Sequence, residues 1–150
     1  MVATLEDVTA ARAGKTVVFT NGVFDVLHAG HVSLLERAKG LGDILVVGLN
    51  TDESARRLGK GSGRPVNALA DRAAVVAALR AVDFVLAFDE NTPVQLIERL
   101  RPDVHVKGGD YEAGSLPEAP TVRSYGGKVV VLPLLEGHSS TSILKGLGLE

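Results

Sequence analysis

Apolar runs and helical patterns alternate along almost the whole chain. Nearly unbroken apolar runs, typical of strands buried on both faces, occur at 15–20, 43–49, 83–88, 103–107 and 128–132. Periodic apolar residues and capping residues predict helices at 2–12, 29–40, 52–58, 70–81, 93–100, 121–125 and 142–147. This alternation predicts an α/β fold, a single Rossmann-like domain with a doubly wound five-stranded parallel sheet and helices on both faces.

Composition and charge narrow the class of protein. The 150 residues are 45% hydrophobic and 23% charged, which suits one compact domain over 1–150 with its core at about 15–147. A formal net charge of −2 gives no electrostatic reason to expect binding to nucleic acid or to an anionic membrane. The chain has no cysteine, which excludes disulfides and a cysteine nucleophile. It also has no apolar run near the roughly 20 residues of a membrane span, so we expect a cytoplasmic protein.

Residues 20–31, TNGVFDVLHAGH, have the layout of a phosphate-binding site. They lead from a predicted strand through a glycine turn to a helix start, where unpaired N–H groups and the helix dipole favour an anion. His28 and His31 are three residues apart, so both can donate hydrogen bonds to one phosphate chain. A capping or partly buried histidine is the structural alternative. A zinc site is another, and it needs a third ligand from His105, His138 or a carboxylate.

Polar clusters follow four of the five predicted strands. Besides the histidine stretch, they lie at 50–53, 107–111 and 136–141. Because ligands of open parallel sheets bind beyond the carboxyl ends of the strands, we expect these clusters to meet at one site. The glycine-rich basic segment 59–65, GKGSGRP, lacks apolar periodicity and is expected to be a mobile loop nearby.

Four segments in the same order resemble the HIGH-motif nucleotidyltransferases of the cytidylyltransferase-like superfamily. They are HAGH at 28–31, RPVNALADR at 64–72, VKGGDY at 106–111 and EGHSSTSI at 136–143. The second and third segments are similar to the heptose 1-phosphate adenylyltransferase branch. The resemblance implies transfer of AMP from ATP to a sugar 1-phosphate, D-glycero-D-manno-heptose 1-phosphate, giving ADP-heptose and pyrophosphate. It also implies Mg²⁺ as cofactor and a homodimer or higher homo-oligomer.

The resemblance implies a role for each matching residue. The catalytic residues would be His28, His31 and Lys60. The nucleotide would be bound by Thr20, Asn21, Gly22, Phe24, Asp25, Gly30, Lys107, Gly108, Ser139, Ser140 and Thr141. The sugar phosphate would be bound by Arg64, Asp71, Arg72, Gly109 and Asp110. Asp25 is a candidate Mg²⁺ ligand or, alternatively, part of an Asx-type turn.

Other hypotheses remain at several points. For Lys60 and Arg64 the alternative is a solvated basic loop, and this loop is one residue longer than is typical of the branch. For Arg72 the alternative is a surface ion pair. Leu134 and Leu135 stand where cytidylyltransferases for glycerol phosphate or choline phosphate carry an Arg-Thr pair, which favours ATP. A CTP-dependent cytidylyltransferase acting on a polyol phosphate such as glycerol 3-phosphate is the second hypothesis, and a non-catalytic nucleotide-binding module is the third.

Overall fold

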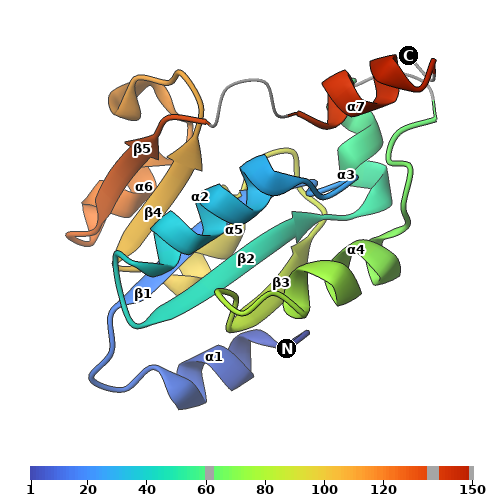
Figure 1. The fold of residues 1–150 in the computed structure, drawn as a ribbon. Helices are drawn as coiled ribbons and strands as arrows, with labels where there is room; N and C mark the ends of the chain where they lie inside the picture. The colour runs from blue at the N-terminus through green and yellow to red at the C-terminus, as the bar shows by residue number, and fades with distance from the viewer. Residues whose placement is uncertain (60–62, 135–138, 149–150) are drawn as a thin grey trace.

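A computed structural model describes residues 1–59, 63–134 and 139–148, and a five-stranded sheet lies at its centre (Figure 1). The strands are β1 (Val17–Gly22), β2 (Ile44–Asn50), β3 (Phe84–Phe88), β4 (Val104–Gly108) and β5 (Lys128–Leu132). All pairings are parallel, in the spatial order β3-β2-β1-β4-β5. Each strand lies where an apolar run predicts one.

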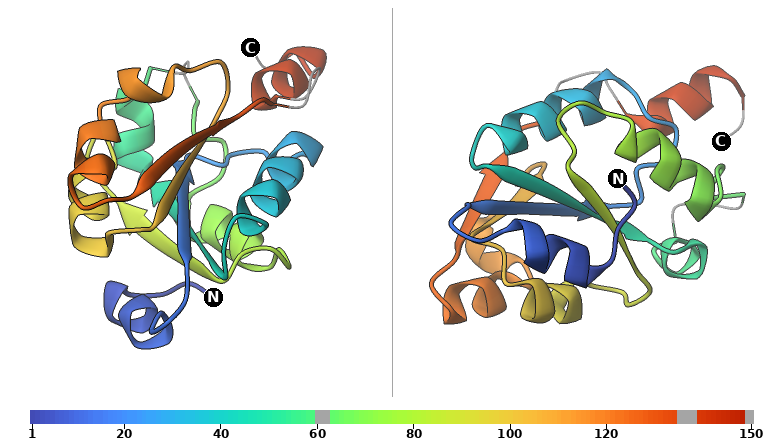
Figure 2. Two further views of the ribbon diagram at one scale, coloured as in Figure 1. Left: turned by 90° about the vertical axis from the view of Figure 1, so that its left-hand side faces the viewer. Right: turned by 90° about the horizontal axis from the view of Figure 1, so that it is seen from below.

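Helices cover both faces of this sheet (Figure 2). They are α1 (Leu5–Ala11), α2 (Ala29–Lys39), α3 (Asp52–Arg57), α4 (Leu69–Ala77), α5 (Val94–Leu100), α6 (Ala119–Ser124) and α7 (Ser140–Gly146), with a 3₁₀ turn η1 (Ala113–Ser115). Helices α2 and α4 pack on one face, and α1, α5 and α6 pack on the other. The predicted α/β class with a doubly wound parallel sheet is therefore confirmed.

Each face of the sheet has its own apolar core, because side chains along a strand point alternately to the two faces. On one face Val47 of β2 belongs to the same cluster as Leu35 of α2 and Val76 of α4. On the other face Phe19 of β1 belongs to the cluster that contains Ile97 of α5. All five side chains are fully buried. The two cores fix the strands, and with them the loops that leave their carboxyl ends.

β1 and β4 part from one another halfway along the sheet. β1 pairs with β2 along all six of its residues. It pairs with β4 only at Val18↔Val104 and Phe19↔His105. The chain also crosses from one side of the sheet to the other at these two strands, and ligands of open α/β sheets bind at such a switch point. We therefore expect a ligand-binding site at the carboxyl ends of β1 and β4.

Some boundaries differ from the predicted ones. α4 ends at Ala77 rather than at residue 81, because the N–H groups of Leu79 and Val82 bond to carbonyls three residues back and turn the chain toward β3. Pro93 caps α5 instead of forming its first turn, and η1 is an element that the pattern does not predict. Within the described ranges, no helix has the length and apolar character needed to cross a membrane.

Candidate active site

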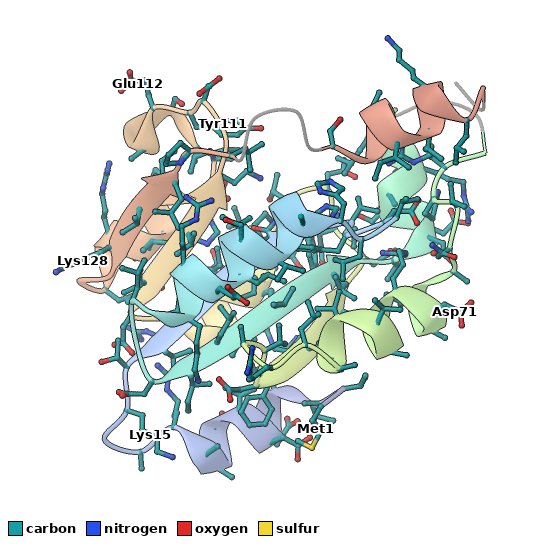
Figure 3. All side chains as sticks on the ribbon, viewed as in Figure 1. Met1, Lys15, Asp71, Tyr111, Glu112 and Lys128 are labelled. Atoms are coloured by element: carbon teal, nitrogen blue, oxygen red, sulfur yellow. The ribbon has the colours of Figure 1, made fainter. Side chains whose placement is uncertain are left out.

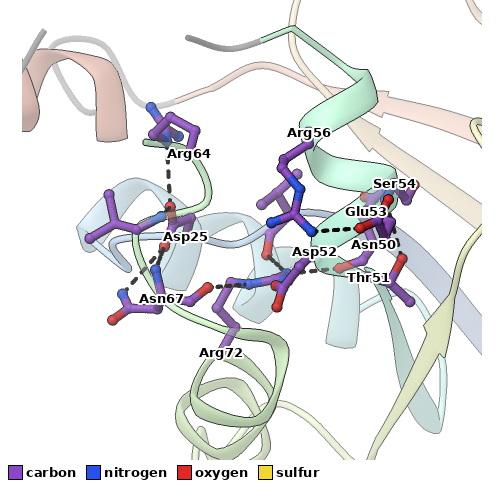
Figure 4. Close-up of polar contacts among 12 residues, drawn as sticks. Asp25, Asn50, Thr51, Asp52, Glu53, Ser54, Arg56, Arg64, Asn67 and Arg72 are labelled. Atoms are coloured by element: carbon purple, nitrogen blue, oxygen red, sulfur yellow. Dashed lines mark hydrogen bonds and ion pairs between the residues drawn. The ribbon is translucent and has the colours of Figure 1, made fainter. Parts of the chain in front are cut away.

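The loop that follows β1 is strained and is held by one buried carboxylate. Phe24 and Val26 both have φ of 51°, a left-handed conformation that is costly for a β-branched residue such as valine. Asp25 lies between them and is 2% exposed. Its carboxylate accepts the N–H of Val26 at 3.1 Å and the N–H of Asn67 at 3.0 Å, and it also accepts the N–H of Val66. Asp25 thus ties the β1 loop to the segment that precedes α4 (Figure 4).

Arg64 completes this arrangement. Its Nε lies 3.4 Å from Oδ2 of Asp25, and its side chain is only 8% exposed (Figure 4). Arg64 is therefore not part of a solvated basic loop. The contacts of Asp25 use both carboxylate oxygens, so they favour its turn-forming role over the magnesium-ligand role. In the described part of the chain, no group of three or more His, Asp or Glu side chains is arranged to bind a metal ion.

His28 and His31 cap the start of α2 for each other. Nδ1 of His28 accepts the N–H of Gly30 at 3.0 Å, and Nδ1 of His31 accepts the N–H of His28 at 3.1 Å. This is a capping box in which two imidazoles replace the usual Ser and Glu side chains. Because each Nδ1 accepts a hydrogen bond, the neutral rings carry their hydrogen on Nε2. The cap thus presents Nε2–H as the donor of each ring, and the α2 dipole adds partial positive charge.

A cavity of about 220 Å³, which we call the histidine cavity, opens beside these rings. It is lined by Val23, Phe24, Asp25, His28, Gly30, His31, Leu34, Arg64, Leu134, Ser139 and Thr141. Candidate residues from three distant segments, the β1 loop with α2, the Arg64 segment and the start of α7, therefore meet around one space. Arg64 was predicted on the sugar side, and the structure places it with the histidines instead.

A second cavity, of about 350 Å³, occupies the gap where β1 and β4 part, and we call it the crevice cavity. Its lining residues are Asn21, Gly22, Val23, Asn50, Leu58, Asn91, Thr92, Pro93, Lys107, Tyr111, Leu116, Pro117 and Glu118. It lies on the side of α5 and α6, whereas the histidine cavity lies on the side of α2. Val23 belongs to both linings, so the β1 loop forms the wall between the two spaces.

The predicted nucleotide-binding residues do not all line the same cavity. Asn21, Gly22 and Lys107 line the crevice cavity and not the histidine cavity. Thr20 is 1% exposed and lines neither cavity. Gly108 packs against α2, and an added Cβ there would come within 2.9 Å of Leu34. Position 108 therefore requires a glycine because β4 packs closely on α2 there.

Of the predicted sugar-binding residues, Arg72 has an internal role. Arg72 is 2% exposed, and its guanidinium donates to the backbone oxygens of Asn67, Val23 and Asn50. It also pairs with Asp52 at 2.6 Å (Figure 4). These bonds join α4 to the ends of β1 and β2. Arg72 is thus a buried connection inside the protein, which corrects both the phosphate-contact prediction and its surface-ion-pair alternative.

The remaining sugar-binding candidates lie outside the two cavities. Asp71 is exposed on the outer side of α4 (Figure 3). Gly109 and Asp110 line a shallow cavity at the β4–β5 edge, together with Tyr111 and Glu112. Lys60 and His138 lie outside the described residues, and of Ser140 only its place at the start of α7 is described.

The crevice cavity is also lined by candidate functional residues that no sequence pattern predicted. Asn91 and Thr92 directly precede the predicted helix at 93–100, and the sequence pattern gives them no binding role. Tyr111 ends the predicted polar cluster 107–111 but was given no role there, and Glu118 lies in a loop that carries no motif. Position in the sequence could have indicated a binding role for Asn91 and Thr92. Both come shortly after the carboxyl end of β3, and ligands of open parallel sheets bind beyond such strand ends.

Comparison with known proteins agrees with this geometry. The chain is 56% identical over 137 residues to D-beta-D-heptose 1-phosphate adenylyltransferase of Bordetella bronchiseptica, covering 91% of this chain and 85% of that protein. It is 59% identical over 129 residues to the bifunctional protein HldE of Streptomyces coelicolor, but this covers 86% of this chain and 28% of HldE. The chain therefore spans little more than a quarter of the length of HldE.

Solved structures give the same fold. The lipopolysaccharide core biosynthesis protein of Thermoplasma volcanium superposes with a TM-score of 0.68 at 30% identity, covering 83% of this chain and all of that one. Pantoate-beta-alanine ligase of Francisella tularensis superposes with a TM-score of 0.57 at 16% identity, with coverage of 95% and 75%, and shows a shared fold alone. Residues 19–145 match the family described as cytidylyltransferase-like. The chain belongs to the cytidylyltransferase-like family.

Proposed function

We propose that this chain is an adenylyltransferase that moves AMP from ATP to D-glycero-β-D-manno-heptose 1-phosphate, giving ADP-heptose and pyrophosphate. The observation that carries the proposal is the mutual cap of His28 and His31, which presents two Nε2–H donors at the start of α2 beside a cavity. The name of the Bordetella bronchiseptica relative, at 56% identity, supports heptose 1-phosphate as the acceptor.

The triphosphate is held in the histidine cavity. His28 and His31 donate to the phosphate oxygens from one side, while Ser139, just before α7, and Thr141, in its first turn, line the same space. Arg64 adds positive charge from a third direction. Donors fixed before the substrate arrives stabilise charge that develops on the phosphates without a cost for reorganisation.

The sugar phosphate occupies the crevice cavity, across the wall formed by the β1 loop. A phosphate oxygen of the sugar forms a bond to the α-phosphorus, and the bond from that phosphorus to the bridging oxygen of pyrophosphate breaks. No covalent intermediate with the protein is needed, so the protein positions the reactants and stabilises charge. Lys107 provides the cation on the acceptor side.

Mg²⁺ would enter this reaction with the nucleotide. Both oxygens of Asp25 are used by N–H donors and Arg64, and the described residues hold no metal cluster. The described residues would therefore hold the ion indirectly, by donating hydrogen bonds to the phosphates that bind it, and not as its direct ligands. When bound together with the triphosphate, Mg²⁺ would neutralise negative charge that develops on the leaving pyrophosphate.

The proposal is tested by measuring pyrophosphate release with each nucleoside triphosphate, with and without Mg²⁺. The acceptors are the two anomers of heptose 1-phosphate and glycerol 3-phosphate. We expect release only with ATP, Mg²⁺ and the β anomer of heptose 1-phosphate. CTP-dependent release with glycerol 3-phosphate would replace the proposal with the cytidylyltransferase hypothesis. Nucleotide binding without release from any acceptor would favour the non-catalytic module.

A further inference from the structure

A buried histidine–carboxylate hydrogen bond lies at the base of the crevice cavity. His105 is at the last position where β1 and β4 pair, is fully buried, and stacks on Phe19 with 5.6 Å between ring centroids. Its Nε2 lies 2.8 Å from Oε2 of Glu118. Glu118 lines the crevice cavity and is 3% exposed. The pair thus sits where the two strands separate.

The Glu118 carboxylate is ionised, and its hydrogen bond with His105 uses only one of its two oxygens. Burial by itself raises the pKa of this carboxyl, but hydrogen bonds from His105 and a backbone N–H, with the charges of His105 and Lys107, bring the pKa below its ordinary value. His105 therefore carries hydrogen on Nε2 and donates it to Oε2. Among the hydrogen bonds between side chains of the described residues, none involves Oε1 of Glu118.

The crevice cavity offers acceptors for hydroxyl groups together with one cation. Asn21 also lines the cavity, and its side-chain oxygen is buried without a hydrogen-bond partner among the described residues. Lys107 lines the same space, with its ammonium 5.4 Å from the centre of the Tyr111 ring. Buried acceptors normally find donors, so this lining fits a molecule with several hydroxyls and one anionic group.

We infer that Glu118 is the residue that recognises the sugar hydroxyls of the acceptor, and that His105 is a positioning residue that holds its carboxylate toward the crevice cavity. This inference rests on the proposed function in placing a sugar phosphate there. Oε1 of Glu118 and the amide oxygen of Asn21 accept hydrogen bonds from hydroxyls, and Lys107 binds the phosphate. A ligand without hydroxyls leaves both acceptors unpaired and is bound more weakly.

The test measures binding rather than turnover, by calorimetry with heptose 1-phosphate, inorganic phosphate and ATP as separate ligands. In Glu118→Gln the amide oxygen still accepts from His105, but an NH₂ group replaces the second acceptor. We expect heptose 1-phosphate to bind about tenfold more weakly or worse, the scale for losing a hydrogen bond to a charged group, with phosphate and ATP unaffected. Glu112→Gln is the matched control, because Glu112 is exposed in the same loop outside the cavity.

His105 is tested by two further variants. His105→Phe keeps a ring on Phe19 but removes the donor, and it should weaken heptose 1-phosphate binding without changing ATP binding. His105→Gln restores a donor near the place of Nε2 and should recover part of the sugar affinity. A purely structural role would lower stability in both variants without separating the sugar from ATP.

A second arm needs no variant and remains informative if the substitutions unfold the protein. Monodeoxy analogues of heptose 1-phosphate are titrated into the unmodified chain, and at least one should bind about tenfold more weakly. The inference is overturned if every analogue binds like the parent sugar, if folded Glu118→Gln keeps full affinity, or if the unmodified chain does not bind heptose 1-phosphate. Selective sugar binding without pyrophosphate release would instead overturn the proposed function and leave the role of Glu118 standing.

Discussion

At the scale of single residues, His28 combines a structural and a chemical task in one ring. Its Nδ1 accepts the Gly30 N–H and so caps the N-terminus of α2. Its Nε2 carries the hydrogen that the proposed reaction uses. The two alternatives considered for the histidines, a cap and a phosphate donor, are therefore compatible. Substitutions can separate the two tasks because they use different nitrogens.

We predict that His28→Asn and His28→Ala lose turnover alike but differ in stability. Both remove Nε2–H, so turnover should fall roughly 100-fold, the scale for losing one fixed charge-stabilising donor. Asparagine is a good N-cap and alanine is not, so only His28→Ala should also lose about 1 kcal/mol of unfolding free energy. Steady-state kinetics and urea unfolding measure the two quantities. Equal stability of the variants would contradict the capping role, and full turnover in His28→Asn would contradict the chemical one.

Asp25 and Arg72 show what the sequence leaves undecided at this scale. Residue type and spacing predicted that Asp25 belongs with the histidine stretch, and it lies there, whereas Arg64 was predicted on the sugar side and lies beside the histidines instead. They could not show that the oxygens of Asp25 bind backbone N–H groups, or that Arg72 turns inward to bind three carbonyls. The same atoms can serve a ligand or the protein, and only three-dimensional contacts decide between these uses.

At the scale of elements, the close packing of β4 on α2 sets the position of the histidines. Gly108 ends β4, and an ideal Cβ there would lie 2.9 Å from side-chain atoms of both Leu34 and Leu134. Leu134 is exposed and can move, but Leu34 is buried in the core on the underside of α2. Any side chain at position 108 therefore pushes on the helix that carries His28 and His31.

We predict that Gly108→Ala destabilises the protein by about 1–3 kcal/mol, the usual cost of overpacking a core. Turnover should fall as well, because displacement of α2 moves both imidazoles. Gly146→Ala is the matched control, since an added Cβ there meets nothing within 4 Å at the end of α7. Thermal and urea unfolding of the two variants measure the difference. A Gly108→Ala protein as stable and active as the control would contradict the packing argument.

Elements defined by strong periodicity were predicted well, and those defined by tertiary contacts were not. The five strands follow from apolar runs, and β5 has the predicted bounds. The helix predicted at 70–81 stops at Ala77, because the chain must turn there to place Leu79 against the core. In isolation, the alanine-rich end would continue as a helix. Helix propensity alone does not contain that requirement.

At the scale of the whole molecule, the His105–Glu118 pair links stability to pH. The pKa of Glu118 in the folded protein is below its ordinary value of 4.5, so folding favours the ionised carboxylate. The resulting stabilisation is complete above the unfolded pKa and is lost as the pH falls through the folded pKa. The pair joins β4 to the loop before α6, so its loss should be felt in global unfolding.

We predict that the difference in unfolding free energy between the unmodified chain and Glu118→Gln depends on pH. It should be largest above about pH 5 and should shrink as the pH is lowered below about 4.5, because the glutamine variant has no carboxyl to protonate. Urea titrations at a series of pH values measure this difference. A difference that stays constant or grows toward low pH would show that Glu118 is not ionised in the folded protein. Glu112→Gln should show no comparable pH dependence.

The architecture could be predicted from the sequence, but the shape of the site could not. The alternation of strand and helix patterns predicts the layered α/β architecture. It also predicts the edge of the sheet at which polar residues gather. The crevice cavity exists because β1 and β4 pair at only two positions, and this register depends on packing in both cores. Its residues Asn91, Thr92 and Glu118 carry no motif. The homodimer that the family resemblance implies stays a prediction.

The wall formed by Val23 has a stereochemical consequence under the proposed function. It separates the histidine cavity on the α2 side from the crevice cavity on the side of α5 and α6. The sugar phosphate therefore approaches the α-phosphorus from one side while pyrophosphate departs toward the other. A single in-line displacement with this geometry inverts the configuration at the α-phosphorus. An ATP made chiral at that atom by a sulfur substituent would yield a sugar nucleotide of inverted configuration.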